Sequence, residues 1–584
     1  MTKIENIEIR TPDKYHILDN LFEKKLRNKE FFELTLKAFQ LSSSVKQKKL
    51  AITESLKANK NVTLFPHQIL AAEKMINEFA CTGLLADEVG LGKTIEAGII
   101  IKELIVSGDV KNVLILAPPS LVPQWQGELL SKFDLDFIKQ VEDNRFIDCA
   151  SHNFLIMSHA SAIGENNQRL LNKRVWDIVI VDEAHSMKNA QTFKHKMVKN
   201  LFKKRLILLS ATPIQNNLQE LYNMIELLRP SLLGTWQGFR EKFTIDKDIR
   251  RLNPRYRDVL QEIISDVVIR NTRKQVSEYI DFKERIAQNH LLEPKEEEKI
   301  LYESITEKLR EMYTSQFSEM IIMLYQKYIS SSTATTKEAI KQMRKKDYIS
   351  NEEYEKYLNL AEKIIIDSKM QDVLNLIKTD NSKFLIFCEY KATQKYIVSV
   401  LQKHGILCTI FNGEMSSEQK TESKNRFENK VQVMISTSAG GEGQNLQFCH
   451  NVINYDLPWN PMKVEQRIGR VHRIGQDKDV KIHNFAIKDT IEGFILELLF
   501  QKIELFTLTL GELDVMFEGT SSQEITRKFF REYMSSKNKN DIRDKFTVLG
   551  DEWKKNKDYV NNVVQTFNKK TFETFSLGTV SSNE

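Results

Sequence analysis

The chain has 584 residues, 41% of them hydrophobic, and carries a formal net charge of +6. This length is too great for one hydrophobic core and the composition is that of a globular protein, so we expect three or four folded units rather than large-scale disorder. The mild positive charge indicates only a modest preference for polyanions. The five cysteines lack the close spacing of a zinc or redox pair, the first residues contain no apolar signal core, and the longest apolar stretch is interrupted by charges, which together predict a cytoplasmic protein without a membrane partner.

The first half of the chain changes character near residue 60. Residues 1–60 place apolar residues at helical spacing among Lys and Glu, which predicts a helical N-terminal extension. Short aliphatic runs then alternate with helical stretches, a pattern typical of buried parallel strands joined by crossover helices. The runs are residues 82–86, 112–118, 153–158, 176–185 and 205–213. We therefore predict a first α/β lobe over residues 61–290, with a helical protrusion from about residue 214.

The second half repeats this organisation after a helical middle. Residues 291–370 are rich in Lys, Glu, Leu and Met and predict a helical linker, within which the run "SSSTATTK" (330–337) predicts an exposed loop. A second lobe is expected over residues 371–510 and a C-terminal extension over residues 511–584, because strand signals return at residues 383–390, 405–413, 431–437, 450–456 and 480–487. The expected fold class is α/β, with two tandem lobes that each contain a parallel sheet, helical protrusions between them and helical extensions at both ends.

The stretch "LLADEVGLGKTIEAG" (84–98) resembles a phosphate-binding loop between a strand and a helix. Backbone N–H groups at the start of that helix could hold phosphate oxygens, and Gly90 and Gly92 would let the backbone approach closely. Lys93 would reach the β- and γ-phosphates, and the Thr94 hydroxyl would bind Mg²⁺. The alternative is an ordinary strand–turn–helix, because Asp87 stands where the general pattern has its first Gly.

A pair of acids favours the nucleotide interpretation. In "DIVIVDEAH" four apolar residues precede Asp182, which could hold the Mg²⁺ shell, and Glu183, which could orient or deprotonate the attacking water. Gln68 lies shortly before the loop, where its amide could read the adenine edge, although a solvated helix residue is the alternative there. Ser210 and Thr212 follow another predicted strand and could sense the γ-phosphate.

The phosphate loop, the acid pair and the polar residues after the next strand occur in an order that resembles helicase superfamily two, and within it the Swi/Snf-like ATPases. Their first motif is spelled Asp-Glu-x-Gly-Leu-Gly-Lys-Thr, as residues 87–94 are here, so an Asp in place of Gly is that family's own spelling. Residues 436–447 resemble the family's fifth motif, residues 456–461 the segment after it, and residues 465–476 the sixth motif. The Asp-Glu-Ala-His sequence at 182–185 and other details are more similar to the bacterial branch that includes the RNA polymerase-associated ATPase RapA, or HepA.

The resemblance implies two RecA-like lobes, with ATP and Mg²⁺ as cofactors. It implies catalytic roles for Lys93, Asp182, Glu183, Arg470 and Arg473, the two arginines standing at the start of a predicted helix of the second lobe. The expected nucleotide contacts are Gln68, Asp87, Glu88, Gly90, Leu91, Gly92, Lys93, Thr94 and Gln466. The expected Mg²⁺ ligands are Thr94 and Asp182, and the residues expected to couple the lobes are His185, Ser210, Thr212 and Gly443.

In this superfamily nucleic acid crosses both lobes, which makes segments 118–125, 436–441 and 459–461 the candidate contacts. Hydroxyl and backbone N–H groups hold phosphates without reading bases, so we expect sequence-tolerant and salt-sensitive binding. The candidate contact residues are Ser120, Gln124, Thr437, Ser438, Gly441 and Trp459.

The resulting hypothesis is a DNA-stimulated ATPase that moves along double-stranded DNA and displaces or remodels bound proteins. Three alternatives remain: an accessory ATPase that recycles RNA polymerase, a motor subunit of a restriction or phage-defence system, and a passive nucleotide-dependent binding module. A DEAD-box type of RNA helicase is less favoured, because such enzymes have a short connection where this chain has a long helical stretch. The acidic segment 544–555 resembles a nuclease signature only loosely and has no companion motif.

Overall fold

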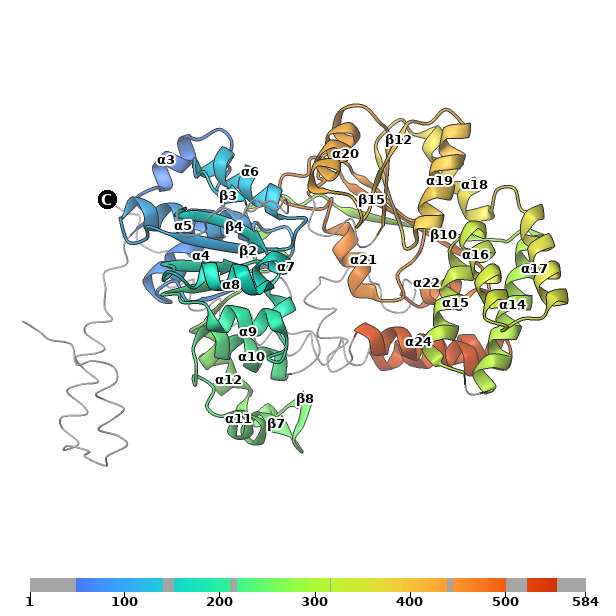
Figure 1. Cartoon of the computed structure of the whole chain (residues 1–584), viewed down its shortest axis with the longest axis horizontal. Helices are drawn as coiled ribbons and strands as arrows, with labels where there is room; N and C mark the ends of the chain where they lie inside the picture. The colour runs from blue at the N-terminus through green and yellow to red at the C-terminus, as the bar shows by residue number, and fades with distance from the viewer. Residues whose placement is uncertain are drawn as a thin grey trace, which may run out of the picture. The chain divides into compact units, whose positions relative to one another are not determined.

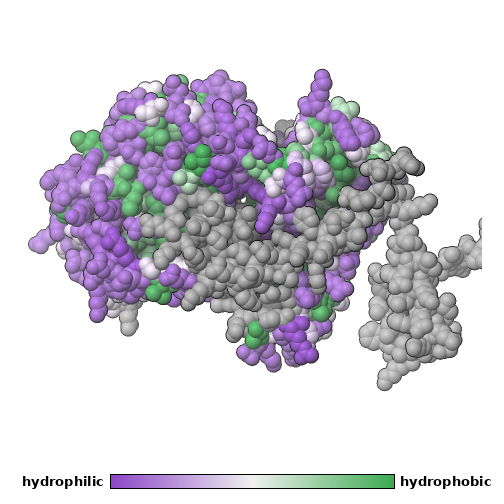
Figure 2. All heavy atoms as spheres, turned by 180° about the vertical axis from the view of Figure 1, so that it is seen from behind, coloured by the Kyte–Doolittle hydropathy of each residue, from purple (hydrophilic) through white to green (hydrophobic). Residues whose placement is uncertain are grey.

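The computed structural model describes residues 49–139, 152–210, 218–315, 317–437, 445–499 and 522–553. The chain divides into a short unit, Met1–Leu50, and a large unit, Ala51–Glu584, and all the elements described below belong to the large unit. None of the helices in these ranges has the length and apolar content needed to cross a membrane. On the face drawn in Figure 2, hydrophilic residues predominate over the coloured surface and hydrophobic residues form small groups among them.

The first lobe contains a parallel sheet in the order β3-β4-β2-β5-β6-β1-β9. Three of these strands, β2, β3 and β4, are labelled in Figure 1. The central strands of this sheet are buried because helices cover both faces, as their unbroken aliphatic sequences predict. The strands are β1 (Gly83–Leu85), β2 (Val113–Ala117), β3 (Ile138–Lys139), β4 (Phe154–Ser158), β5 (Ile178–Val181), β6 (Leu206–Leu209) and β9 (Val268–Ile269). The early helices are α3 (Thr53–Ala58), α4 (Pro66–Asn77), α5 (Lys93–Val106), α6 (Val122–Phe133), α7 (His159–Ile163), α8 (Glu165–Leu171) and α9 (Phe193–Asn200).

A protrusion of mixed structure leaves this lobe after residue 217. It contains α10 (Leu218–Leu228), α11 (Trp236–Phe243), the antiparallel pair β7 (Thr244–Ile245) and β8 (Asp248–Leu252), and α12 (Arg257–Ser265). Stacked and edge-on aromatic rings of Tyr222, Trp236 and Phe239 hold the helices together. The chain then returns to the sheet through β9, so this protrusion is an insertion before the last strand of the first sheet.

The second lobe contains a parallel sheet in the order β10-β15-β14-β11-β13-β12. The strands are β10 (Arg285–Leu292), β11 (Phe384–Cys388), β12 (Cys408–Phe411), β13 (Val433–Thr437), β14 (Asn451–Asn454) and β15 (Val480–Ile487). All five strand signals of the second half are confirmed. The boundary drawn at residue 290 falls inside β10, which pairs with β15 along its whole length, so the chain enters the second sheet before the helical middle begins.

A helical bundle follows β10 and packs against the second lobe. It comprises α14 (Glu296–Thr314), α15 (Glu319–Ser331), α16 (Thr333–Lys345) and α17 (Asn351–Lys363), and α16 contacts α19 of the lobe. One hydrophobic core is continuous from Ile305 and Ile340 of the bundle to Leu385 of the sheet. The remaining helices are α18 (Ser368–Thr379), α19 (Lys391–Lys403), α20 (Ser417–Asn429), α21 (Pro461–Ile468), α22 (Ile491–Glu497) and α24 (Ser522–Ser535).

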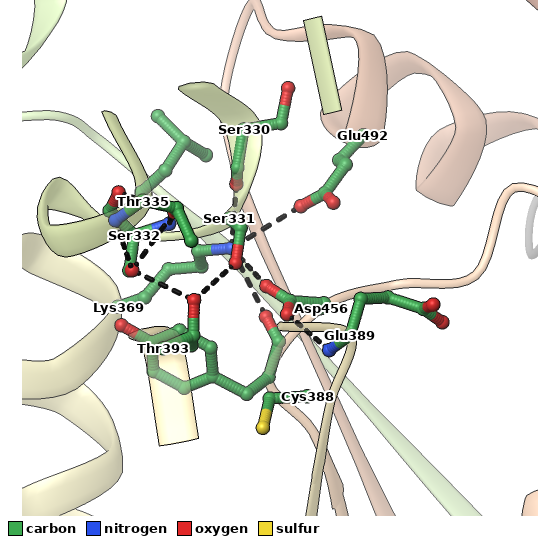
Figure 3. Close-up of polar contacts among 12 residues, drawn as sticks. Ser330, Ser331, Ser332, Thr335, Lys369, Cys388, Glu389, Thr393, Asp456 and Glu492 are labelled. Carbon is green, nitrogen blue, oxygen red and sulfur yellow. Dashed lines mark hydrogen bonds and ion pairs between the residues drawn. The ribbon is translucent and has the colours of Figure 1, made fainter. Parts of the chain in front are cut away.

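The Ser/Thr run at 330–337 is not an exposed loop, so that prediction is wrong. It forms the junction between α15 and α16, where Ser331 and Thr335 are each only 1% exposed. Ser332 caps α16 by accepting a hydrogen bond from the backbone N–H of Thr335. Hydroxyls of Ser331 and Ser332 both contact the Thr393 hydroxyl, at 2.6 and 2.8 Å (Figure 3). The polar run is buried because these side chains satisfy one another's hydrogen bonds.

Candidate functional site

The predicted phosphate loop leaves β1 and enters α5 at Lys93. Gly90 and Gly92 have φ values of +89° and +98°, a region that favours glycine, and Gly92 is the N-cap of α5. Leu91, between them, is fully buried in a small apolar cluster. Thr94 is the second residue of α5, so its hydroxyl and the first N–H groups of the helix belong to the same turn. This is the local geometry that binds phosphate at a helix N-terminus.

The loop acids Asp87 and Glu88 face the segment that follows β9. The Asp87 carboxylate accepts hydrogen bonds from the backbone N–H of Asn271 at 2.8 Å and from its side-chain amide at 3.0 and 3.1 Å. Glu88 Oε2 accepts from the backbone N–H of Arg273 at 3.0 Å. Both acids are buried, at 0% and 3% exposure. The geometry therefore favours an anchoring role over the predicted nucleotide contact, and it explains why an Asp occupies the position of the missing Gly.

Lys93 is held inside the loop by main-chain carbonyls. Its ammonium donates to the Asp87 carbonyl at 2.6 Å and to the Glu88 carbonyl at 3.4 Å. Burial lowers the pKa of Lys93, and the nearby Asp87 and Glu183 carboxylates offset only part of that effect. Because only neutral carbonyls hold this half-buried ammonium, an anionic ligand could replace them as its partner.

Two neighbouring residues of α4 contact the phosphate loop at Leu91. Gln68 donates from its amide to the Leu91 carbonyl at 3.0 Å and accepts from the Phe65 N–H at 3.1 Å, so it is not a solvated helix residue. The imidazole of His67, which the sequence did not single out, also contacts the Leu91 carbonyl at 3.0 Å. Both side chains are buried. The start of α4 thus fixes the backbone conformation of the predicted phosphate loop.

Asp182 directly follows β5, and two hydrogen-bond donors orient its carboxylate. Its Oδ2 accepts from the indole N–H of Trp125 at 2.8 Å, and its Oδ1 accepts from the Glu183 backbone N–H at 2.8 Å. Burial, reinforced by the charge of Glu183, raises the pKa of Asp182 to about 6. Trp125 belongs to a segment predicted to contact nucleic acid. Its side chain is only 1% exposed, however, and it orients the Asp182 carboxylate. Sequence reasoning missed this link, which joins residues 57 positions apart.

Glu183 sits in a left-handed conformation, with φ of +48°, at the start of a short 3₁₀ turn. Its Oε2 lies 3.1 Å from Nδ1 of His185, one of the predicted coupling residues. Burial acts to raise the pKa of Glu183, but the His185 hydrogen bond and charge, together with Arg470 and Lys93, outweigh it and lower the pKa to about 2. Glu183 is therefore ionised at neutral pH, and its side chain remains partly exposed where a water could meet it.

The donor set of the predicted metal site fits Mg²⁺, because the Thr94 hydroxyl and the Asp182 carboxylate supply the hard oxygen ligands that this ion prefers. A second group, His67, Asp87 and Glu96, has its possible ligand atoms within 4.8 Å of one another. Burial, followed by the charge of Asp87, raises the pKa of Glu96 well above its usual range, because two buried carboxylates at this spacing repel each other.

The arginines of the second lobe lie beyond the end of α21, and not at the start of a helix as predicted. The Arg473 guanidinium donates to the Gly469 carbonyl at 2.8 Å. Burial and Arg470 lower the pKa of Arg473 to about 10, while Glu183 and Asp182 act in the opposite direction. Since Arg470 in turn lowers the pKa of Glu183, both arginines act electrostatically on the acids of the first lobe.

The second lobe holds α21 in place through a residue that had not been singled out. Arg467 donates to Asn454 Oδ1 at 2.9 Å, to the Asp456 carbonyl at 2.8 Å and to Glu389 Oε1 at 2.8 Å. These bonds fix α21 to the carboxyl ends of β14 and β11. Gln466, predicted to contact nucleotide, is the neighbouring, partly exposed residue of the same helix.

The remaining predicted residues are dispersed. Ser210 is buried just after β6, Ser120 lies in the turn before α6, and Thr437 ends β13. Gln124 on α6 donates to Glu128 at 2.8 Å. Trp459 is only 4% exposed. Four further predicted residues lie outside the described part of the chain: Thr212, Ser438, Gly441 and Gly443.

Comparison with known proteins identifies two domains in this chain. An SNF2-related domain matches residues 67–351, and a helicase conserved C-terminal domain matches residues 368–475. The ATP-dependent helicase YqhH of Bacillus subtilis (strain 168), itself uncharacterized, is 38% identical over 486 residues, which cover 82% of this chain and 85% of YqhH. The RNA polymerase-associated protein RapA of Yersinia enterocolitica is 27% identical over 545 residues.

That alignment covers 87% of this chain but 56% of RapA, so the chain spans about half the length of RapA. Among solved structures, the SWI2/SNF2 ATPase core of Sulfolobus solfataricus in complex with dsDNA aligns with 80% of this chain and 97% of its own, with a TM-score of 0.38 and 25% identity. The two domain matches and the YqhH relative determine the family. The chain belongs to the SNF2-related family and is an ATP-dependent, helicase-like enzyme.

Proposed function

We propose that this enzyme couples ATP hydrolysis to movement along double-stranded DNA and thereby displaces or remodels proteins bound to it. In this mechanism Lys93 exchanges the Asp87 and Glu88 carbonyls for the β- and γ-phosphates of ATP. Thr94 and Asp182 would hold Mg²⁺, which would supply charge neutralisation on the phosphates.

The acid and the arginines complete the chemistry. Glu183, whose pKa lies at about 2, is too weak a base to take a proton early and is better suited to accept a hydrogen bond from water and orient it. Arg470 and Arg473 approach from the second lobe and stabilise the charge that spreads over the γ-phosphoryl oxygens. Hydrolysis therefore requires both lobes, and closure of the lobes couples chemistry to motion.

The observation that carries the choice of duplex DNA is the burial of two aromatic side chains. Proteins that track single strands stack successive bases on exposed aromatic rings. Trp125 and Trp459 lie in the candidate nucleic-acid segments, but they are 1% and 4% exposed. Trp125 is committed to Asp182, and the ammonium of Lys327 lies 5.0 Å from the Trp459 ring centroid. The remaining candidates offer hydroxyl and amide groups, which suit the phosphates of an intact duplex.

A side-by-side ATPase assay tests this proposal. Double-stranded DNA should stimulate turnover more than single-stranded DNA or RNA, and stimulation should weaken steeply as salt is raised. The full-length protein should displace the third strand of a triplex in an ATP-dependent manner and should not separate a forked duplex. An RNA-only response, or efficient fork unwinding, would contradict the proposal.

A second candidate function follows from the relationship to RapA, whose name records association with RNA polymerase. On this proposal the same motor acts on polymerase that has stalled on DNA. Tagged protein should then retain RNA polymerase after nuclease treatment of the lysate. Loss of polymerase under that treatment would indicate a shared DNA contact and would leave the first proposal as the better one.

A further inference from the structure

One side chain joins the phosphate loop to the sixth-motif segment of the second lobe. Arg273 begins the short helix α13 (Arg273–Val276), and its Nη2 donates to the Val89 carbonyl at 2.8 Å and to the His472 carbonyl at 2.8 Å. Its Nη1 also contacts His472 Nδ1. Because the Arg273 backbone N–H is bound by Glu88, the guanidinium is fixed from the loop side and reaches across to the other lobe.

The chemistry of its partners determines the tautomer of His472. The Nε2 atom of His472 lies 2.7 Å from the Lys283 carbonyl, which can only accept, so Nε2 carries the hydrogen. Nδ1 faces Arg273 and also Arg285 Nε at 2.9 Å, and guanidinium groups can only donate, so Nδ1 is a bare acceptor. Burial and the two arginines lower the pKa of His472 to about 3, which keeps the ring neutral. Arg285 is itself held by the buried Glu465 at 2.8 Å.

We call the contacts between Arg273 and His472 the joint. The two backbone segments that the joint connects, the phosphate loop and residues 469–474, also contact each other directly. The Ile474 N–H donates to the Gly90 carbonyl at 3.3 Å. A Cβ atom added to Gly469 would lie 2.7 Å from a methyl group of Val89, and one added to Gly90 would lie 3.3 Å from Arg473 Cα. Glycine is needed at 469 because the segment that carries the arginines rests against the loop. Any displacement of this joint would therefore move Arg473 relative to the phosphates.

We propose that Arg273 and His472 are positioning residues for ATP hydrolysis, which hold the segment carrying Arg470 and Arg473 in register with the phosphate loop. This inference rests on the catalytic role proposed for those two arginines. Neither Arg273 nor His472 needs to touch the nucleotide, because their side chains are committed to each other and to backbone carbonyls. The expected consequence of breaking the joint is a loss of kcat, with the KM for ATP largely retained.

A double-mutant cycle on the full chain tests the proposal. Arg273→Ala should lower kcat by up to about 100-fold, since small misplacements of catalytic groups carry penalties of that size. Because Arg273 acts through both arginines, adding Arg273→Ala to the variant Arg470→Ala/Arg473→Ala should change kcat by less than about 2-fold. Multiplication of the effect of Arg273→Ala with that of the arginine pair would overturn the inference. Lys274→Ala is the matched control, because it removes an exposed charge from the same helix and should leave kcat unchanged.

Two conservative variants separate positioning from general stability. His472→Asn keeps an acceptor near the position of Nδ1, whereas His472→Gln keeps a donor near Nε2 and loses that acceptor. If the bond to Arg273 positions the segment, His472→Asn should retain more turnover than His472→Gln at equal melting temperature, and the reverse order would contradict the proposal. The measurements use basal as well as DNA-stimulated turnover. An unaffected Arg473→Ala enzyme would refute the underlying catalytic role, whereas a multiplicative cycle would refute only the joint.

Discussion

Two lysines of this protein, one half-buried and one buried, differ in the sign of their pKa shift. Lys93 lies in the phosphate loop, where burial lowers its pKa and the neighbouring acids do not compensate. Lys369 lies on α18, only 3% exposed, and there Glu492 and Asp456 outweigh the effect of burial and raise its pKa (Figure 3). The first cation lacks sufficient anionic charge within the protein, and the second already has it. This difference indicates that Lys93 is available to bind an anionic ligand, whereas Lys369 stabilises the fold.

The surroundings of Lys369 explain its structural role. Its ammonium donates to the Ser330 carbonyl at 2.8 Å, to the Tyr455 carbonyl at 3.1 Å and to Glu492 at 3.3 Å. It also lies 3.5 Å from Asp456, the residue that opens the segment before α21. One lysine thus ties the α15–α16 junction to β14 and α22, and the helical bundle to the second lobe.

Within the first lobe, the largest effect should come from the acid of the ATP site. Glu183→Gln should lower turnover by about 10²- to 10⁴-fold, because it removes the charge that orients the attacking water. ATP binding should persist, since Lys93 and the loop are untouched. Turnover and nucleotide affinity measured on the same preparation check this. Loss of ATP binding would show that Glu183 supports the loop itself.

The lysine of the loop is expected to have the next effect. Lys93→Ala should lower turnover by at least about 10²- to 10³-fold and weaken ATP binding, because the phosphates lose their cation. The melting temperature of this variant should not fall, since it removes a half-buried charge that the protein compensates poorly. A strongly destabilised Lys93→Ala protein would abolish the distinction between the two lysines.

The structural lysine should behave in the opposite way. Lys369→Met should destabilise the fold by about 3–5 kcal/mol, because it leaves Asp456 and Glu492 buried without their partner. Since the folded pKa of Lys369 is raised, its contribution is fully present below the unfolded value of about 10.4 and is lost only as the pH rises through the folded value. Burial raises the pKa of Glu492 to about 8, so this partner becomes fully ionised only above that pH. The stability gap between wild type and Lys369→Met in urea unfolding should therefore widen from pH 7 to about 9, and narrow only at the alkaline end, where Lys369 loses its proton.

The comparison also shows what could be predicted from the sequence. The phosphate loop, the acid pair and ten of the strands were predicted because each is encoded by neighbouring residues. Contacts such as Trp125 with Asp182, or Arg273 with His472, join positions 57 and 199 apart, and no local pattern reveals them. The Ser/Thr run at 330–337 was misread for a related reason: polar composition predicts solvent, whereas here distant hydroxyls replace it.

The smallest effect concerns that hydroxyl network. Thr393→Val should cost about 1–3 kcal/mol, because the Ser331 and Ser332 hydroxyls lose a buried partner. Thr393→Ser keeps the hydroxyl and serves as the control. Turnover per folded molecule should be the same in both variants. A Thr393→Val enzyme with normal stability but reduced DNA stimulation would instead give the junction a role in coupling.

The most direct test of the two-lobe account is the DNA-stimulated turnover of full-length Arg473→Ala, measured together with its affinity for ATP. Arginines inserted at the γ-phosphoryl group contribute about 10³- to 10⁵-fold to turnover, and we predict a loss in this range. ATP affinity should change little, because the loop, Lys93 and Gln68 all belong to the first lobe. Turnover close to that of wild type, or a loss of ATP binding as large as the loss of turnover, would contradict the account.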